Sequence, residues 1–134
     1  MLQIDFFGKI TGLGGVFIKV NDPKSLADWY NQCLGISFNG SSYVDLPFTD
    51  PDGKLTAGSN VLSFFPNHTA YFDPSEKKVT INLRVEDRFG LLEELKSKRV
   101  ELIGEPVDEE YGKFAWIMDP EGNKIELWES LVSK

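Results

Sequence analysis

The sequence contains one pattern of structural elements twice, and this internal repeat limits the possible fold more than any other feature. Three short matches occur in the same order in both halves of the chain. Val20-Asn21-Asp22 corresponds to Val85-Glu86-Asp87, Asp50-Pro51-Asp52-Gly53 to Asp119-Pro120-Glu121-Gly122, and Val61-Leu62-Ser63-Phe64 to Lys124-Ile125-Glu126-Leu127. One such match could arise by chance, whereas three in order indicate two copies of the same unit.

Local signals predict the same elements in both copies. In the first copy, residues 12–20 are typical of a strand, Asp22 and Pro23 begin a helix, and Gly35 ends it. Two or three short strands follow between residues 36 and 65. In the second copy, residues 79–85 form the strand, and Glu86 and Asp87 begin a helix. Its apolar stripe contains Phe89, Leu92 and Leu95, and short strands continue to residue 129.

These elements predict an α+β fold made of tandem β-α-β-β-β modules. We expect one domain over residues 1–134, with module 1 at about 12–66, a polar linker at about 67–78 and module 2 at about 79–129. Paired by a pseudo-two-fold axis, the modules would form a half-open, barrel-like sheet with the helices on its outer face.

Side chains alternate between the two faces of a strand, so the pattern also predicts which residues face the cleft. Uniformly apolar rows belong under the helices: Val16, Ile18, Val20, Leu62, Phe64, Ile81, Leu83, Val85, Ile125 and Leu127. Mixed and polar rows belong in the cleft: Gly15, Phe17, Lys19, Val61, Ser63, Phe65, Thr80, Asn82, Arg84, Lys124, Glu126 and Trp128.

The segment 112–129 reads as strand, tight turn and strand. Glu126 lies between apolar neighbours on the second strand, either in solvent or lining a concave site. Phe114, Trp116 and Met118 share one face of the first strand, and the sequence leaves open whether that face lines the cleft.

Composition excludes several classes of function. The chain of 134 residues has a net charge of −7, which argues against nucleic acid or an anionic membrane as a partner. No apolar run reaches membrane-spanning length, and no export signal is evident, so we expect a cytoplasmic protein. The single histidine and the single cysteine, Cys33, offer no Ser-His or Cys-His machinery, and we expect Cys33 to be buried in the first helix.

The tandem modules and the final DPEGNKIELWE resemble the vicinal oxygen chelate superfamily, also called the glyoxalase/bleomycin resistance/dioxygenase superfamily. The resemblance covers residues 13–129 and is most specific over residues 119–127. The strand GVFIKVND and the helix segment SLADWY, followed by Leu34-Gly35, support it. It implies the half-barrel fold, whereas function within such a fold varies widely.

Catalytic members of that superfamily hold a divalent metal with ligands from the first and last strand of each module. The resemblance places the four ligand positions at Gly15, Ser63, Thr80 and Glu126. Glycine has no side chain, and neutral hydroxyls are poor ligands for zinc, iron or nickel. We therefore expect no cofactor and no metal site.

The resemblance leaves two hypotheses. The first is a metal-free protein of the bleomycin-resistance type that binds a small molecule through Phe17, Lys19, Ser63, Phe65, Asn82, Arg84, Trp116 and Trp128. The second is an enzyme: a lyase or isomerase of the lactoylglutathione lyase type, or a dioxygenase-like enzyme. Glu126 would be its general base, and Lys19 or Arg84 would stabilise an enediolate. A divalent metal could take part in this second case. Under both hypotheses we expect a homodimer, because each module exposes sheet edges and a half-open cleft. The identity of the ligand stays open.

Overall fold

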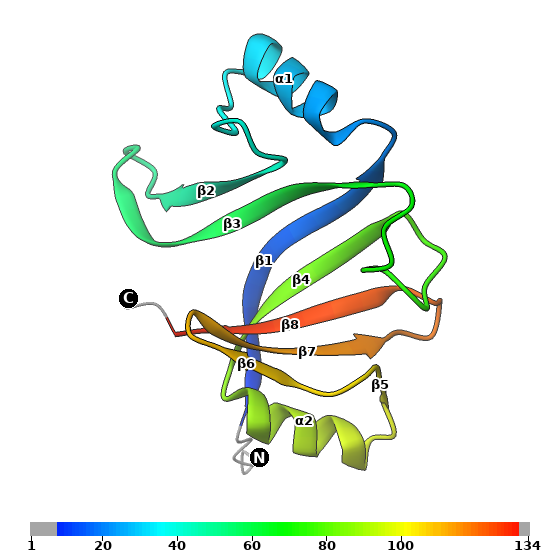
Figure 1. Ribbon diagram of the computed structural model, residues 1–134. Coiled ribbons are helices and arrows are strands. Elements are labelled where there is room, and N and C mark those ends of the chain that lie inside the picture. Colours follow the sequence, from blue (N-terminus) through cyan, green and yellow to red (C-terminus); the bar gives the residue numbers. More distant parts are fainter. Residues whose placement is uncertain (1–7, 132–134) are drawn as a thin grey trace.

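Two strands, one from each half of the chain, lie side by side at the centre of the structure (Figure 1). The structure is a computed structural model and describes residues 8–131. Strand β1 (Lys9–Val20) runs antiparallel to β4 (Val79–Glu86), and each has a parallel neighbour from its own half. The neighbour of β1 is β3 (Leu55–Pro66), and that of β4 is β8 (Lys124–Ser130). This symmetric arrangement is the one the repeat predicts.

The remaining strands extend the sheet outward on both sides. β2 (Tyr43–Thr49) pairs with β3, and β7 (Gly112–Met118) pairs with β8. The short strands β5 (Glu101–Leu102) and β6 (Val107–Glu109) both pair with β7. The strand order is β2-β3-β1-β4-β8-β7-β5, an open mixed sheet of eight strands that confirms the predicted α+β class.

Both helices begin where the sequence predicts. In α1 (Pro23–Leu34), the Asp22 side chain accepts a hydrogen bond from the Ser25 amide, and Gly35 closes the helix in the left-handed region. In α2 (Arg88–Ser97), Asp87 caps the first turn in the same way by accepting from Gly90. Short polar side chains therefore satisfy amide groups that have no partner within the helix.

The two matching turns have the same hydrogen bonds. The Asp50 carboxylate accepts from the amides two and four residues later, and the Asp119 carboxylate does the same. The glycines at the equivalent positions, Gly53 and Gly122, have φ angles of 85° and 84°. The repeat therefore extends to the backbone conformation of the turns that precede β3 and β8.

Each helix covers the sheet of its own half on the face predicted from strand alternation. Ala27 of α1 packs with Phe64 and its neighbours, and Leu91 and Leu92 of α2 pack with Val85 and Leu127. Three residues that the sequence pattern predicts to be buried are exposed. Ile81 is 42% exposed, because it lies on the central strand pair between the areas that the two helices cover. Phe89 of α2 is 70% exposed, and Cys33 is exposed on α1, where packing buries Ala27 and no other residue of that helix.

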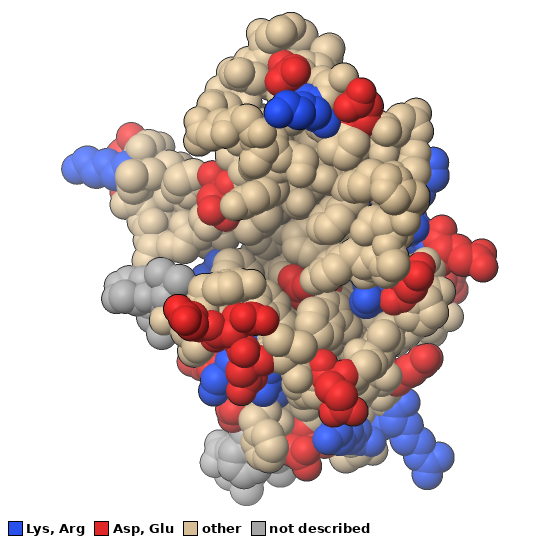
Figure 2. Space-filling view, viewed as in Figure 1, with Lys and Arg blue, Asp and Glu red and all other residues tan. Residues whose placement is uncertain are grey.

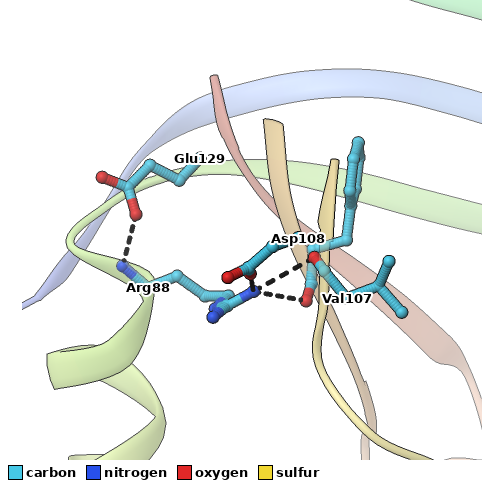
Figure 3. A network of polar contacts seen from close by, with 5 residues as sticks. Arg88, Val107, Asp108 and Glu129 are labelled. Carbon is cyan, nitrogen blue, oxygen red and sulfur yellow. Dashed lines mark hydrogen bonds and ion pairs between the residues drawn. The ribbon is translucent and has the colours of Figure 1, made fainter. Parts of the chain in front are cut away.

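A buried arginine fixes the start of α2 against the sheet (Figure 3). Arg88 donates through Nη1 to the carboxylate of Asp108 at 2.6 Å and to the carbonyls of Val107 and Phe114. Its backbone amide donates to the Glu129 carboxylate at 2.9 Å. The last strand is thereby joined to the second helix.

Among residues 8–131, neither helix has the length and apolar character needed to cross a lipid bilayer.

Candidate functional site

The face of the sheet opposite the helices encloses a cavity of about 800 Å³ between the two halves of the chain. Aromatic side chains from β1, β2, β7, β8 and the turn before β7 line it: Phe17, Tyr43, Phe48, Tyr111, Phe114 and Trp128. The centre of the face seen in Figure 2 is mostly uncharged, and most basic side chains lie toward its periphery. Volume and aromatic lining are those of a small-molecule site.

Glu126 lies at the inner end of this cavity and is only 3% exposed. Its carboxylate accepts hydrogen bonds from the Trp116 indole at 3.0 Å, from the Tyr71 hydroxyl and from the Asn82 amide. Burial raises the pKa of Glu126, and the three hydrogen bonds oppose that rise without cancelling it. The site therefore contains a carboxylate that holds its proton more tightly than one in water.

The segment 67–78, which the sequence suggests is a polar linker, packs onto the cleft face of the sheet. It contains no helix or strand, yet Phe72 is fully buried and Tyr71 stacks on Phe65. Lys124 donates to the Tyr71 carbonyl at 2.7 Å, and burial lowers the pKa of Lys124. Sequence reasoning missed Tyr71, although the pair Tyr71-Phe72 in an otherwise polar segment was a usable signal.

Two adjacent glycines of β1 allow close approach of different neighbours. A Cβ atom at Gly14 would lie 2.0 Å from Asn82 Oδ1, and one at Gly15 would lie 2.4 Å from the Val61 carbonyl oxygen. The side-chain oxygen of Asn82 occupies the space beside Gly14, and its NH₂ group points toward Glu126. Gly14 thus helps to orient a donor to the buried carboxylate, and Gly15 lets β3 lie close to β1.

Arg84 spans the cavity between the two halves. Its Nη1 donates to the Ser59 carbonyl of β3 at 3.0 Å. Its guanidinium carbon lies 5.0 Å from the ring centroid of Trp128 and 5.8 Å from that of Phe48, distances typical of cation–π contacts.

The structure brings five of the predicted site residues together around the cavity: Phe17, Asn82, Arg84, Glu126 and Trp128. Trp116 contacts the site through Glu126, and Phe65 lies under Tyr71. Ser63 is not in the cavity lining, and Lys19 lies over the Phe72 ring at 5.2 Å, beside a second, shallower depression.

Four aromatic residues of the lining within residues 8–131 had no place in the sequence-based site: Tyr43, Phe48, Tyr111 and Phe114. Phe114 stacks on Trp128 with an angle of 3° between the rings, so the Phe114–Trp116 face of β7 is the one that lines the cleft. Tyr43 and Phe48 belong to β2, whose alternation the sequence pattern did not resolve.

The four ligand positions of the superfamily do not provide a donor set for a divalent transition metal. A side chain at position 15 would collide with β3, and both Glu126 oxygens already accept hydrogen bonds. Ser63 and Thr80 offer only neutral hydroxyl oxygens. The Thr80 hydroxyl has no hydrogen-bond partner within residues 8–131. Over the same residues, no group of three histidine, cysteine, aspartate or glutamate side chains is arranged to hold a metal.

Comparisons with known proteins agree with this architecture. The model of the family described as Glyoxalase/Bleomycin resistance protein/Dioxygenase superfamily matches residues 12–127. No curated protein matches the sequence.

Several solved structures have the same fold. A methylmalonyl-CoA epimerase from Streptomyces coelicolor, in complex with 2-nitronate-propionyl-CoA, has a TM-score of 0.66 at 17% identity and covers 92% of this chain and 100% of its own. The methylmalonyl-CoA epimerase from Mycobacterium tuberculosis has a TM-score of 0.59 at 22% identity, with coverages of 98% and 94%. A glyoxalase/bleomycin resistance protein/dioxygenase superfamily member from Vibrio splendidus 12B01 has a TM-score of 0.56 at 14% identity, with coverages of 88% and 99%. At these identities the similarity shows the fold alone.

Proposed function

We propose that this chain, which belongs to the Glyoxalase/Bleomycin resistance protein/Dioxygenase superfamily, binds a small organic molecule in its cleft without a catalytic metal ion. The observation that carries the proposal is the cavity of about 800 Å³ with six aromatic side chains in its lining. Flat apolar walls with a few fixed polar groups favour binding of an organic ligand over binding of a bare ion.

The arrangement of donors supports the metal-free part of the proposal. Three donors on three different parts of the chain already occupy most of the lone pairs of the Glu126 carboxylate, which has about four. A metal bound to the remaining lone pair would have this single carboxylate as its only charged ligand from the four positions, because Gly15 has no side chain and Ser63 and Thr80 offer neutral hydroxyls.

A capture experiment with a cavity-filling variant tests the binding function. The purified protein is incubated with a metabolite extract, separated from free small molecules and analysed by native mass spectrometry. Ala57→Trp fills the cavity from an exposed position in its wall, and Ala70→Trp places the same side chain outside it. We expect the wild type and Ala70→Trp to retain a small molecule that Ala57→Trp does not. Equal retention by all three proteins, or none by any of them, contradicts the proposal.

Elemental analysis of the same samples tests the absence of a catalytic metal. We expect no stoichiometric transition metal. A stoichiometric metal that is present in the wild type and lost in Glu126→Gln would contradict this expectation.

A second candidate function is proton transfer by a lyase or isomerase, favoured by the raised pKa of Glu126 within the cavity. Glu126 would remove a proton from carbon, and Arg84 would stabilise the resulting enediolate. The test uses NMR to follow exchange of ligand carbon-bound hydrogen for deuterium in heavy water. Exchange that Glu126→Gln abolishes would favour the enzyme, and binding without exchange would favour the binding protein.

We also propose a homodimer. Val79 and Ile81 are each 42% exposed on the helix-bearing face, and β2 is an edge strand, so apolar surface and backbone groups are available to a second copy. Light scattering should give the mass of two chains for the wild type and of one chain for Ile81→Lys. A wild-type mass of one chain at micromolar concentration contradicts the proposal.

A further inference from the structure

Among residues 8–131, Arg84 is the only basic residue in the cavity lining, and aromatic rings, not an acid, lie against its guanidinium group. Within residues 8–131, no carboxylate lies at ion-pairing distance from its guanidinium group. One carbonyl, that of Ser59, accepts from Nη1, and the other N–H groups of the fork have no partner in the same part of the chain. In a chain with a net charge of −7, an arginine without an acidic partner in a cavity is unusual.

The acidic residues of the lining are mostly occupied by other partners. Glu126 accepts from three donors, Glu129 accepts from the Arg88 amide at 2.9 Å, and Glu86 pairs with Lys9 at 3.4 Å. Asp45 lies exposed on the edge strand β2. Asp45, like Arg84, has no ion-pair partner within residues 8–131, and of the charged groups of the lining Arg84 is the one that can meet an anionic ligand.

We propose that the ligand is a planar aromatic acid whose carboxylate binds the guanidinium edge of Arg84. This inference rests on the proposed binding function and names the class of ligand for the same cavity. The rings of Trp128 and Phe48 lie 5.0 Å and 5.8 Å from the guanidinium carbon, and the Ser59 carbonyl accepts from Nη1. These three contacts limit the orientation of the guanidinium group, and its remaining N–H groups can donate to a carboxylate. The ring system of the ligand packs on the remaining aromatic walls, among them Phe17, Tyr43 and Phe114.

The same geometry disfavours other ligand classes. A cationic ligand would face Arg84 at close range, although the net charge of the chain alone would attract it. A neutral ligand would leave the guanidinium without a counter-charge, and an aliphatic acid would lose the stacking that planar rings provide.

The test uses three probes that separate charge from planarity. These are 2-naphthoate, its neutral amide 2-naphthamide, and the saturated analogue decalin-2-carboxylate, each titrated by isothermal calorimetry at low and high salt. The proteins are wild type, Arg84→Met, Arg84→Lys and the matched control Lys24→Met, which removes an exposed charge on α1 outside the cavity. Circular dichroism and thermal melting establish that each variant is folded.

We expect wild type and Lys24→Met to bind 2-naphthoate at least about tenfold more tightly than either of the other probes. Arg84→Met should lose the preference for naphthoate over naphthamide, and Arg84→Lys should keep only part of it because an ammonium lacks the planar fork. If Arg84→Met does not fold, Arg84→Lys carries the test.

Three results would overturn the inference, and they differ in what they say about binding itself. Equal affinity for naphthoate and naphthamide refutes the acid and leaves the binding function standing. A naphthoate preference that survives in Arg84→Met refutes the assignment to Arg84. Failure of all three probes refutes an aromatic acid, and the independent capture experiment with Ala57→Trp then decides whether the cavity binds anything.

Discussion

Replacing Glu126 with glutamine removes a buried charge while keeping the shape of the side chain. One carboxylate oxygen accepts from Tyr71 and Trp116, and the other accepts from Asn82. If the glutamine side-chain oxygen takes the place of the oxygen that accepts from Tyr71 and Trp116, both of these hydrogen bonds remain. The glutamine amide then faces the Asn82 amide, and Asn82 can turn its side chain so that its Oδ1, which has no hydrogen-bond partner within residues 8–131, accepts instead.

The number of hydrogen bonds is therefore conserved, and the difference in stability between Glu126→Gln and wild type depends on the lost charge. Hydrogen bonds to a charged group contribute roughly 1.5–3 kcal/mol, compared with about 0.5–1.5 kcal/mol for neutral pairs, so glutamine loses part of this stabilisation. The variant also gains stability, because a neutral glutamine avoids the cost of burying an ionised carboxylate. Burial is the larger effect, because it raises the pKa of Glu126 despite the three hydrogen bonds. We expect Glu126→Gln to be at least as stable as the wild type at neutral pH.

The sign of the pH dependence follows from the raised pKa. Glu126 binds its proton more tightly in the folded than in the unfolded chain, so its favourable contribution is complete below the unfolded value of 4.5 and is lost as pH rises through the folded pKa. The glutamine variant has no such loss. Its free energy of unfolding, relative to wild type, should rise with pH and then level off. The total rise should be about 1.4 kcal/mol for each unit by which folding raises the pKa of Glu126.

Urea denaturation between about pH 4 and pH 8 measures this difference. Glu105→Gln is the matched control, because it removes the same charge from an exposed loop position. The control should show no comparable rise relative to wild type. Either of two results would refute the reasoning: a flat difference for Glu126→Gln would mean that the hydrogen bonds balance burial, and one that falls with pH would mean that they outweigh it.

Three further substitutions test other parts of the structure by the free energy of unfolding in urea. Tyr71→Phe removes a donor to the buried carboxylate and should cost about 1 kcal/mol; an unchanged stability would mean that the segment 67–78 is not held to the sheet by this contact. Gly14→Ala places a Cβ atom 2.0 Å from Asn82 Oδ1 and should cost about 1–3 kcal/mol, whereas Gly12→Ala, whose Cβ would have no atom of residues 8–131 within 4 Å, should cost little. Similar costs at both glycines would count against the steric argument. Arg88→Met leaves the partly buried carbonyls of Val107 and Phe114 without this donor and should cost about 2 kcal/mol; a neutral result would show that water replaces the guanidinium.

The fold could be predicted because its determinants are local and occur twice. Asp22 with Pro23, Asp87, and the aspartates of the two matching turns each act on amides within four residues of themselves. Strand alternation then assigned Phe17, Asn82 and Glu126 to one face, and the cavity lies on that face. Such signals need no knowledge of distant contacts.

The rest of the site depends on contacts between parts of the chain that are far apart in sequence. Tyr71 and Glu126 are separated by 55 residues, and nothing near Tyr71 indicates that its hydroxyl reaches a carboxylate. Ile81 has the apolar pattern of a buried residue, but its exposure depends on where two helices end over the sheet. Periodicity gives the face on which a residue lies and does not give what covers it.

The close approach of β3 to Gly15 limits how this cleft could be redesigned. Introducing histidine or glutamine at position 15 would require the backbone around Val61 to move, since even a Cβ atom would lie 2.4 Å from its carbonyl oxygen. A single substitution there cannot restore a metal ligand, and the cost of the strand displacement would have to be offset by metal binding. An engineered metal centre would therefore start from the β4–β8 pair, where Asn82 and Glu126 are already register partners, with β1 left unchanged.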